Sequence, residues 1–155
     1  MRSTLLLVLA TAACGSGDAT PSVSVEMAAP ESLVPSDDTL DDLTITVHYD
    51  DGDGDLGGGI AEIQDCRAEP LLIALDIPPI APQDVVDDKT AITGTLDLHV
   101  NDVGDFATEA LPAGCADLGV ADLAAGQTVF CVTLTDAAGH RGDGDCTAAI
   151  ALGTL

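Results

Sequence analysis

Residues 43–49 read Leu-Thr-Ile-Thr-Val-His-Tyr, a run in which apolar and polar side chains alternate. Leu43, Ile45, Val47 and Tyr49 lie on one face of an extended chain, and the polar residues lie on the other. This period of two is typical of a half-buried β-strand. Further segments that alternate or are rich in β-branched residues predict strands at 23–27, 60–66, 71–76, 93–100, 128–134 and 147–152.

Clusters of Gly, Asp and Pro separate these segments, and no apolar periodicity of helical length occurs. About seven short strands at this spacing favour an all-β antiparallel sandwich over a barrel. The chain has 155 residues and 2% aromatic residues, which leaves room for one domain with a core of Leu, Ile, Val and Ala. We expect this domain at residues 23–155.

Two stretches resemble parts of known bacterial domains. Residues 43–59, LTITVHYDDGDGDLGGG, resemble a strand and loop of surface-lipoprotein domains that carry a D-G-D-G-D-L-G signature. Residues 122–139, DLAAGQTVFCVTLTDAAG, resemble the penultimate strand and turn of Ig-like domains of the PKD and cadherin-like types. The resemblance implies a single Ig-like β-sandwich and indicates nothing about activity.

The N-terminal segment has the pattern of an export signal. A short positive region, an apolar stretch at residues 5–10 and small residues before Cys14 predict a signal peptide at residues 1–13. Cys14 with its neighbours resembles the lipobox of bacterial lipoproteins, in which the cysteine is acylated, and residues 14–22 have the composition of a flexible tether. We expect a lipid anchor at Cys14 that holds the chain to the membrane of a bacterial cell envelope. The alternative is a secretory signal with an incidental cysteine.

Four Lys and Arg against 27 Asp and Glu give a net charge of −23. This charge excludes the basic surface that nucleic acids require. Every serine lies at or before Ser36, and the three histidines lack ligand spacing, so we expect no enzyme. The sequence predicts a structural or adhesive module. The alternative is an accessory subunit whose acidic loops dock a basic protein, and a hydrolase that uses aspartate carboxylates is the least favoured interpretation.

The densest acidic stretch is Asp-Asp-Gly-Asp-Gly-Asp at residues 50–55. Carboxylates at alternate positions of a glycine-rich loop can converge on one hard cation, and Ca²⁺ prefers such oxygen ligands. Asp51, Asp53 and Asp55 match the first ligands of an EF-hand, with Glu62 at its last position. Leu56 stands where that loop needs glycine, so only the D-x-D-x-D pattern remains as a calcium signal.

A second Gly-Asp-Gly-Asp sequence at residues 142–145 follows Asp136. In the strand order of an Ig-like sandwich, the loops at 50–59 and 136–145 emerge at the same end. We therefore predict a Ca²⁺ site to which Asp136, Asp143 and Asp145 contribute beside the first three aspartates. The alternative is that all these acids are solvated turn residues.

Cysteines other than Cys14 number four: Cys66, Cys115, Cys131 and Cys146. An even number in an oxidising compartment predicts two disulfides, and three connectivities are open. The turn midway between Cys131 and Cys146 favours their pairing, with Cys66 bonded to Cys115, although strict alternation places Cys131 and Cys146 on different faces. A four-thiolate zinc site lacks the usual C-x-x-C pair.

Overall fold

The computed structural model describes residues 19–34, 42–66, 71–80, 91–101, 103, 115, 119–120, 123–124 and 126–153. Every regular element in these residues is a β-strand, which confirms the all-β prediction. The described part of the chain contains no helix long and apolar enough to cross a membrane. The predicted signal peptide, Cys14 and the first part of the tether lie outside the described residues.

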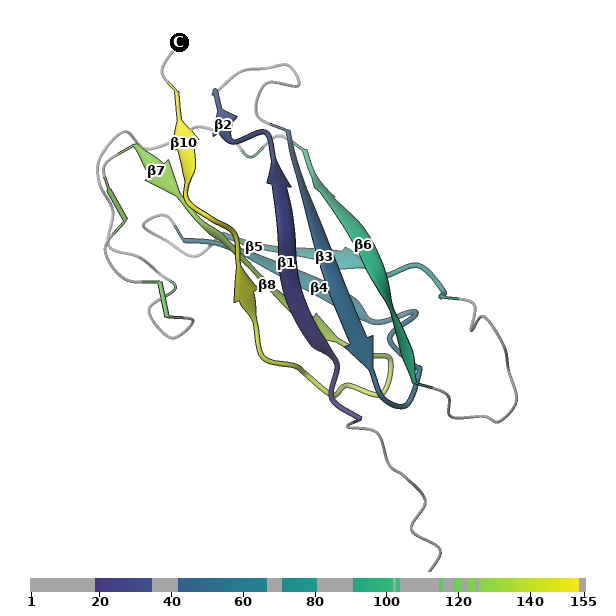
Figure 1. Cartoon of the computed structure of the whole chain (residues 1–155). Helices are drawn as coiled ribbons and strands as arrows, with labels where there is room; N and C mark the ends of the chain where they lie inside the picture. Colours follow the sequence, from purple (N-terminus) through teal and green to yellow (C-terminus); the bar gives the residue numbers. More distant parts are fainter. Residues whose placement is uncertain are drawn as a thin grey trace, which may run out of the picture.

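The first sheet contains the strand that was predicted from residues 43–49. Its order is β1 (Ser22–Ala29), β3 (Leu43–Asp51) and β6 (Ile92–Val100), and both pairings are antiparallel (Figure 1). The four alternating apolar residues of β3 are buried, so the sequence pattern identified the inward face correctly. The strand extends to Asp51, which carries the chain into the acidic loop.

The second sheet has the order β5 (Leu71–Asp76), β4 (Ile60–Asp65), β8 (Phe130–Thr135) and β9 (Asp145–Cys146), again with antiparallel pairings. It packs against the first sheet around one hydrophobic core, to which β3, β4, β6 and β8 all contribute. Burial of each large aliphatic side chain in such a core stabilises the fold by about 1.5–3 kcal/mol.

A small third sheet closes one end of the sandwich. Its order is β2 (Ser32–Leu33), β10 (Ile150–Leu152) and β7 (Gln127–Thr128), with β2 parallel to β10. The segment predicted as one strand at 128–134 is thus divided between β7 and β8, and only the second half of the strand predicted at 147–152 forms, as β10. The fold is an all-β sandwich with more strands than predicted, of which β2, β7, β9 and β10 are short.

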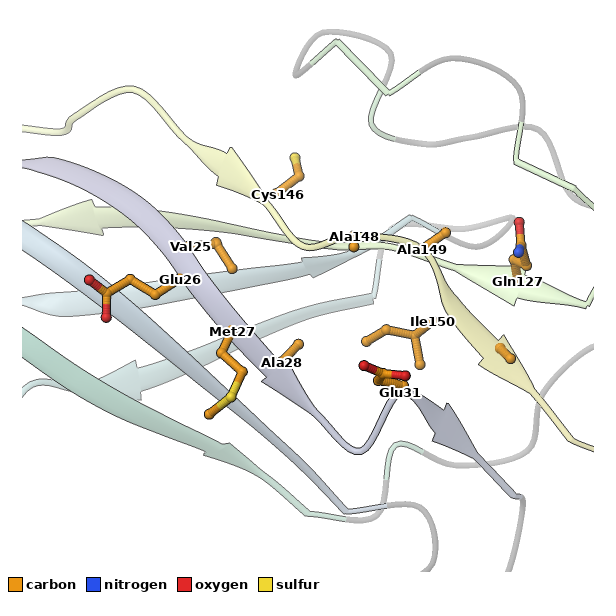
Figure 2. Close-up of a pocket in the computed structure, with 11 residues that line it drawn as sticks. Val25, Glu26, Met27, Ala28, Glu31, Gln127, Cys146, Ala148, Ala149 and Ile150 are labelled. Atoms are coloured by element: carbon orange, nitrogen blue, oxygen red, sulfur yellow. The ribbon is translucent and has the colours of Figure 1, made fainter.

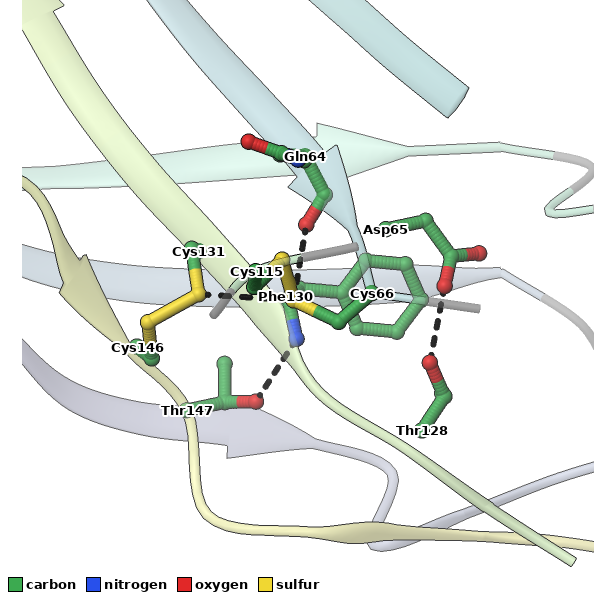
Figure 3. Close-up of a disulfide and its surroundings, with 9 residues drawn as sticks. All are labelled: Gln64, Asp65, Cys66, Cys115, Thr128, Phe130, Cys131, Cys146 and Thr147. Atoms are coloured by element: carbon green, nitrogen blue, oxygen red, sulfur yellow. Dashed lines mark hydrogen bonds between the residues drawn. A yellow bond between two sulfur atoms is a disulfide. The ribbon is translucent and has the colours of Figure 1, made fainter. Parts of the chain in front are cut away.

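The disulfides join Cys66 to Cys115 and Cys131 to Cys146, which confirms the favoured connectivity (Figure 3). Cys131 and Cys146 lie directly opposite each other on β8 and β9. Strict alternation was misleading because β8 is buried on both faces: Phe130 packs in the main core, and Cys131 packs in a second cluster with Cys66 and Cys115.

Candidate metal centre

Four carboxylates meet at one end of the sandwich. Asp51 ends β3, Asp53 and Asp55 lie in the loop that leads to β4, and Asp136 directly follows β8. Because β4 pairs with β8, the loop before β4 and the turn after β8 adjoin. Each of the four aspartates offers a carboxylate oxygen that lies within 4.8 Å of the other three. The structure thus brings together four of the six aspartates that were predicted to share an ion.

The backbone of the acidic loop is fixed by contacts on both sides. Leu56 is fully buried, and its backbone N–H donates to Asp51 Oδ2 at 2.8 Å. The N–H of Ala137 donates to the carbonyl of Asp55 at 3.1 Å, which ties the loop to the turn after β8. A Cβ atom at Gly59 would overlap the carbonyl of Thr135, so glycine permits this close approach. The aspartates are thus held on a defined path.

Asp51 has a buried carboxylate oxygen with no hydrogen-bond partner. Only 1% of this residue is exposed, and while Oδ2 accepts from Leu56, Oδ1 accepts from no group in the protein. Asp53 and Asp55 also each have one buried oxygen without a hydrogen-bond partner. A buried, unsatisfied acceptor costs free energy, and a cation among the four carboxylates would satisfy all three oxygens together.

Burial and mutual repulsion alter the ionisation of the loop carboxylates. Burial raises the pKa of Asp51 above its usual value, and the negative charge of Asp53 raises it further. Burial also raises the pKa of Asp55, with Asp136 and Asp53 adding to the effect. These directions are those of carboxylates that lack a positive partner. A bound cation would reverse both shifts.

Asp136 has a partner that the loop aspartates lack. His140 donates its backbone N–H to Asp136 Oδ1 at 2.8 Å, and its ring Nδ1 lies 2.8 Å from Asp136 Oδ2. Although burial alone would raise the pKa of Asp136, the hydrogen bonds from His140 lower it below the usual value. The same contact raises the pKa of His140. His140 therefore orients Asp136 and keeps it ionised, as residues behind metal ligands commonly do.

The three histidines show no ligand spacing in the sequence, so this role of His140 was not predicted. The signal that could have identified it is the spacing Asp-x-x-x-His across a tight turn. The backbone of the turn brings the two residues together, because Asp136 N–H donates to the carbonyl of His140 at 3.1 Å.

Asp143 and Asp145 do not join the cluster, contrary to their predicted contribution. Asp143 is exposed, and Asp145 lies opposite Val132 on β9, where its Oδ2 accepts the backbone N–H of Val25 at 2.7 Å. The turn after β8 is too short for the second Gly-Asp-Gly-Asp sequence to reach the loop: Gly142 N–H already donates to the carbonyl of Leu134 at 3.0 Å.

Glu62 and the remaining histidines also lie outside the group of four carboxylates. Glu62, which matched the last EF-hand position, forms an ion pair of 2.8 Å with Arg141. His48 and His99 lie on the outer face of the first sheet, where their rings contact Thr93 and Thr44. No three histidine, cysteine or acidic residues of the described chain other than the aspartates and the disulfide cysteines gather closely enough to share an ion.

The donor set of the cluster suits calcium. Ca²⁺ takes hard oxygen ligands at about 2.3–2.6 Å in flexible geometry, whereas Mg²⁺ demands near-octahedral geometry at about 2.0–2.1 Å and usually keeps several of its waters. One oxygen from each of the four carboxylates lies close enough to the others to share one ion. Four carboxylates supply at least four of the six to eight oxygens that Ca²⁺ takes, and water can supply the others.

All four members of the cluster are carboxylates, which are hard oxygen ligands able to bind a cation. No family model matches the chain, and no curated protein or solved structure is significantly similar to it.

Proposed function

We propose that this chain is a non-catalytic structural or adhesive module of a bacterial cell envelope whose loop end is ordered by a bound Ca²⁺ ion. The observation that carries the proposal is the unpartnered, buried Oδ1 of Asp51, a residue that lies in a close group with three further carboxylates. The ion removes the repulsion between these acids and joins the loop after β3 to the turn after β8. Calcium would thus stiffen one end of the sandwich.

The envelope part of the proposal is supported by the lipobox-like sequence at Cys14. Seven residues lie between Cys14 and Ser22, the start of β1, and the eight Cα–Cα steps between these two residues span at most about 28 Å. Ser22 pairs with Asp50, so the tether joins the sandwich at the calcium end. A lipid at Cys14 would hold this end next to the membrane and direct the opposite end outward.

Calorimetric melting tests the calcium site. Compared with chelator, calcium at one hundred times its dissociation constant should stabilise the fold by about 2.7 kcal/mol. For a chain of this size each kcal/mol raises the melting temperature by about 2–4 °C, so we expect a rise of about 5–10 °C. Magnesium should have a smaller effect. Asp53→Asn should abolish the rise and Asp143→Asn should retain it; an unchanged transition at millimolar calcium would refute the site.

Fatty-acid labelling in a bacterial host tests the anchor separately. We expect label on the wild-type chain and none on Cys14→Ser, which should be released from the membrane fraction. A Cys14→Ser chain that retains the label would contradict the anchor and leave the calcium site unaffected.

The alternative, an acidic docking surface for a basic protein, is favoured by one observation. Arg141 is the only lysine or arginine in the described part of the chain, and Glu62 already pairs with it. A docking surface should capture an oligolysine peptide at low salt, release it at high salt and respond little to calcium. A calcium-ordered module should show the melting shift instead.

A further inference from the structure

The two disulfides lie in direct contact with each other. Cys66 Sγ and Cys131 Sγ belong to different disulfides and are 3.5 Å apart, a contact that Figure 3 marks with a dashed line. The sulfur atoms of Cys66, Cys115 and Cys131 all lie within 4.8 Å of one another. Thiol–disulfide exchange proceeds by attack of a thiolate on a disulfide sulfur. At this distance, a thiolate formed from one disulfide has the other disulfide as its immediate neighbour.

The four cysteines differ in their access to solvent. Cys66, Cys115 and Cys131 are at most 1% exposed, whereas Cys146 is half-buried on β9 at the edge of the second sheet. Cys146 borders a groove of about 480 Å³ between β1 and the segment at 146–151, but its sulfur points away from β1 (Figure 2). Asp145, the preceding residue, points toward β1 and accepts the backbone N–H of Val25, so Cys146 faces the other way and packs against the cluster of Cys66, Cys115 and Cys131. Because Cys146 is only half-buried, an external thiol can approach its sulfur more readily than the other three.

We propose that the two disulfides form an exchange relay that reacts with small thiol compounds at Cys146. The thiolate of the compound attacks Cys146 Sγ, the bond to Cys131 breaks, and Cys131 leaves as a thiolate. Cys131 then attacks Cys66 Sγ, and the bond from Cys66 to Cys115 breaks. Cys115 leaves with the electron pair and takes a proton from solvent. The chain now holds a Cys66–Cys131 disulfide, a thiol at Cys115 and a mixed disulfide at Cys146.

A dithiol compound completes the reaction. Its second thiolate attacks the compound's own sulfur in the mixed disulfide, which releases Cys146 as a thiol and closes a disulfide within the compound. The dithiol loses two electrons and two protons, and the protein gains both. The product has one disulfide, between Cys66 and Cys131, and thiols at Cys115 and Cys146. Reducing equivalents thus move from the surface to the buried cluster.

Partial reduction of the full-length chain tests the relay. One equivalent of dithiothreitol is added without oxygen, the reaction is stopped with acid, and free thiols are alkylated. Cleavage after aspartate and glutamate separates the cysteines onto different peptides, because acidic residues lie between each pair of successive cysteines, including Cys14 and Cys66. We expect label on Cys115 and Cys146 and a disulfide between the peptides of Cys66 and Cys131.

Other labelling patterns would overturn the relay. Label on Cys131 and Cys146 with an intact Cys66–Cys115 disulfide would show reduction without transfer. Equal label on all four cysteines would show complete unfolding of a fraction of the chains, and no label would show that a thiol cannot reach Cys146. All these labelling patterns are measured on the wild-type protein, so no outcome depends on a variant that folds poorly.

The approach of the thiol compound is tested by reaction rates. Because the chain carries a net charge of −23, cationic cysteamine should reduce the protein faster than anionic mercaptoethanesulfonate at low salt and equal thiolate concentration. High salt should bring the two rates together. Equal rates at low salt would contradict reaction at the folded, acidic surface.

Discussion

Asp51→Asn should change the stability of the protein in opposite directions with and without calcium. The oxygens of the four carboxylates lie within 4.8 Å of one another. At an effective dielectric constant of about 20, two unit charges at that distance repel by 332/(20 × 4.8), or about 3.5 kcal/mol. Asp53 and Asp55 are the neighbours without a compensating histidine. Because the raised pKa of Asp51 and solvent screening reduce the repulsion, we expect a net stabilisation of about 1–3 kcal/mol in chelator.

The substituted side chain fits the same position. Asparagine retains one oxygen to accept the N–H of Leu56, and its amide group can donate to the neighbouring carboxylates. In calcium the variant lacks one charged ligand and should lose the stabilisation of about 2.7 kcal/mol that the wild-type chain gains at one hundred times its dissociation constant. Stability is measured by urea denaturation with chelator and with calcium.

Asp143→Asn is the control for net charge, because it removes the same charge at an exposed position outside the cluster. It should leave both stabilities within about 0.5 kcal/mol of the wild-type values. Two results would refute the reasoning: Asp51→Asn destabilises the protein equally with and without calcium, or Asp143→Asn reproduces the reversal of sign.

Three further predictions follow from buried or paired side chains. In chelator, the melting temperature should rise as pH falls from about 8 to about 5. The raised pKa of His140 contributes stability that is fully present below pH 6.5 and is lost as the pH rises, and the raised pKa of Asp51 means that its ionisation at higher pH also costs stability. A melting temperature that falls on acidification, measured by calorimetry, contradicts this prediction. Thr128→Val removes the hydroxyl that donates to Asp65 at 2.7 Å and should cost about 1–3 kcal/mol in urea denaturation, a loss below 0.5 kcal/mol being inconsistent with the buried bond. Phe130→Ala empties the largest fully buried side-chain volume and should cost about 3–5 kcal/mol by the same assay, whereas a cost under 1 kcal/mol would indicate a loosely packed core.

Much of the fold was predictable because the first sheet has one buried face. In β3, alternation identifies Leu43, Ile45 and Val47 as inward residues, since the other face of the sheet is exposed or half-buried. The same rule fails in β8, because its outer face is covered by the second cluster, which contains Cys66, Cys115 and Cys131. A sequence cannot show which distant segment covers a strand, so the burial of Cys131 required the structure.

The candidate site was predictable to the extent that local spacing determines it. Alternate positions of a glycine-rich loop bring Asp51, Asp53 and Asp55 together, and the order of strands adds Asp136. Asp145 was wrongly included because the register between β8 and β9 directs it to β1. That register depends on how tightly the turn closes, which the repeated Gly-Asp-Gly-Asp sequence does not specify.

The parallel pairing of β2 with β10 determines how the module would bear a pulling force. β1 begins at one end of the molecule and β10 finishes at the other, so a pull on the two ends draws β2 and β10 in opposite directions along their length (Figure 1). The backbone hydrogen bonds from Ala151 to Glu31 and from Gly153 to Leu33 are then loaded together in shear. The parallel hydrogen bonds between β2 and β10 therefore set the force that the module resists. Once they break, the segment enclosed by each disulfide cannot extend, so the disulfides limit how far the module lengthens.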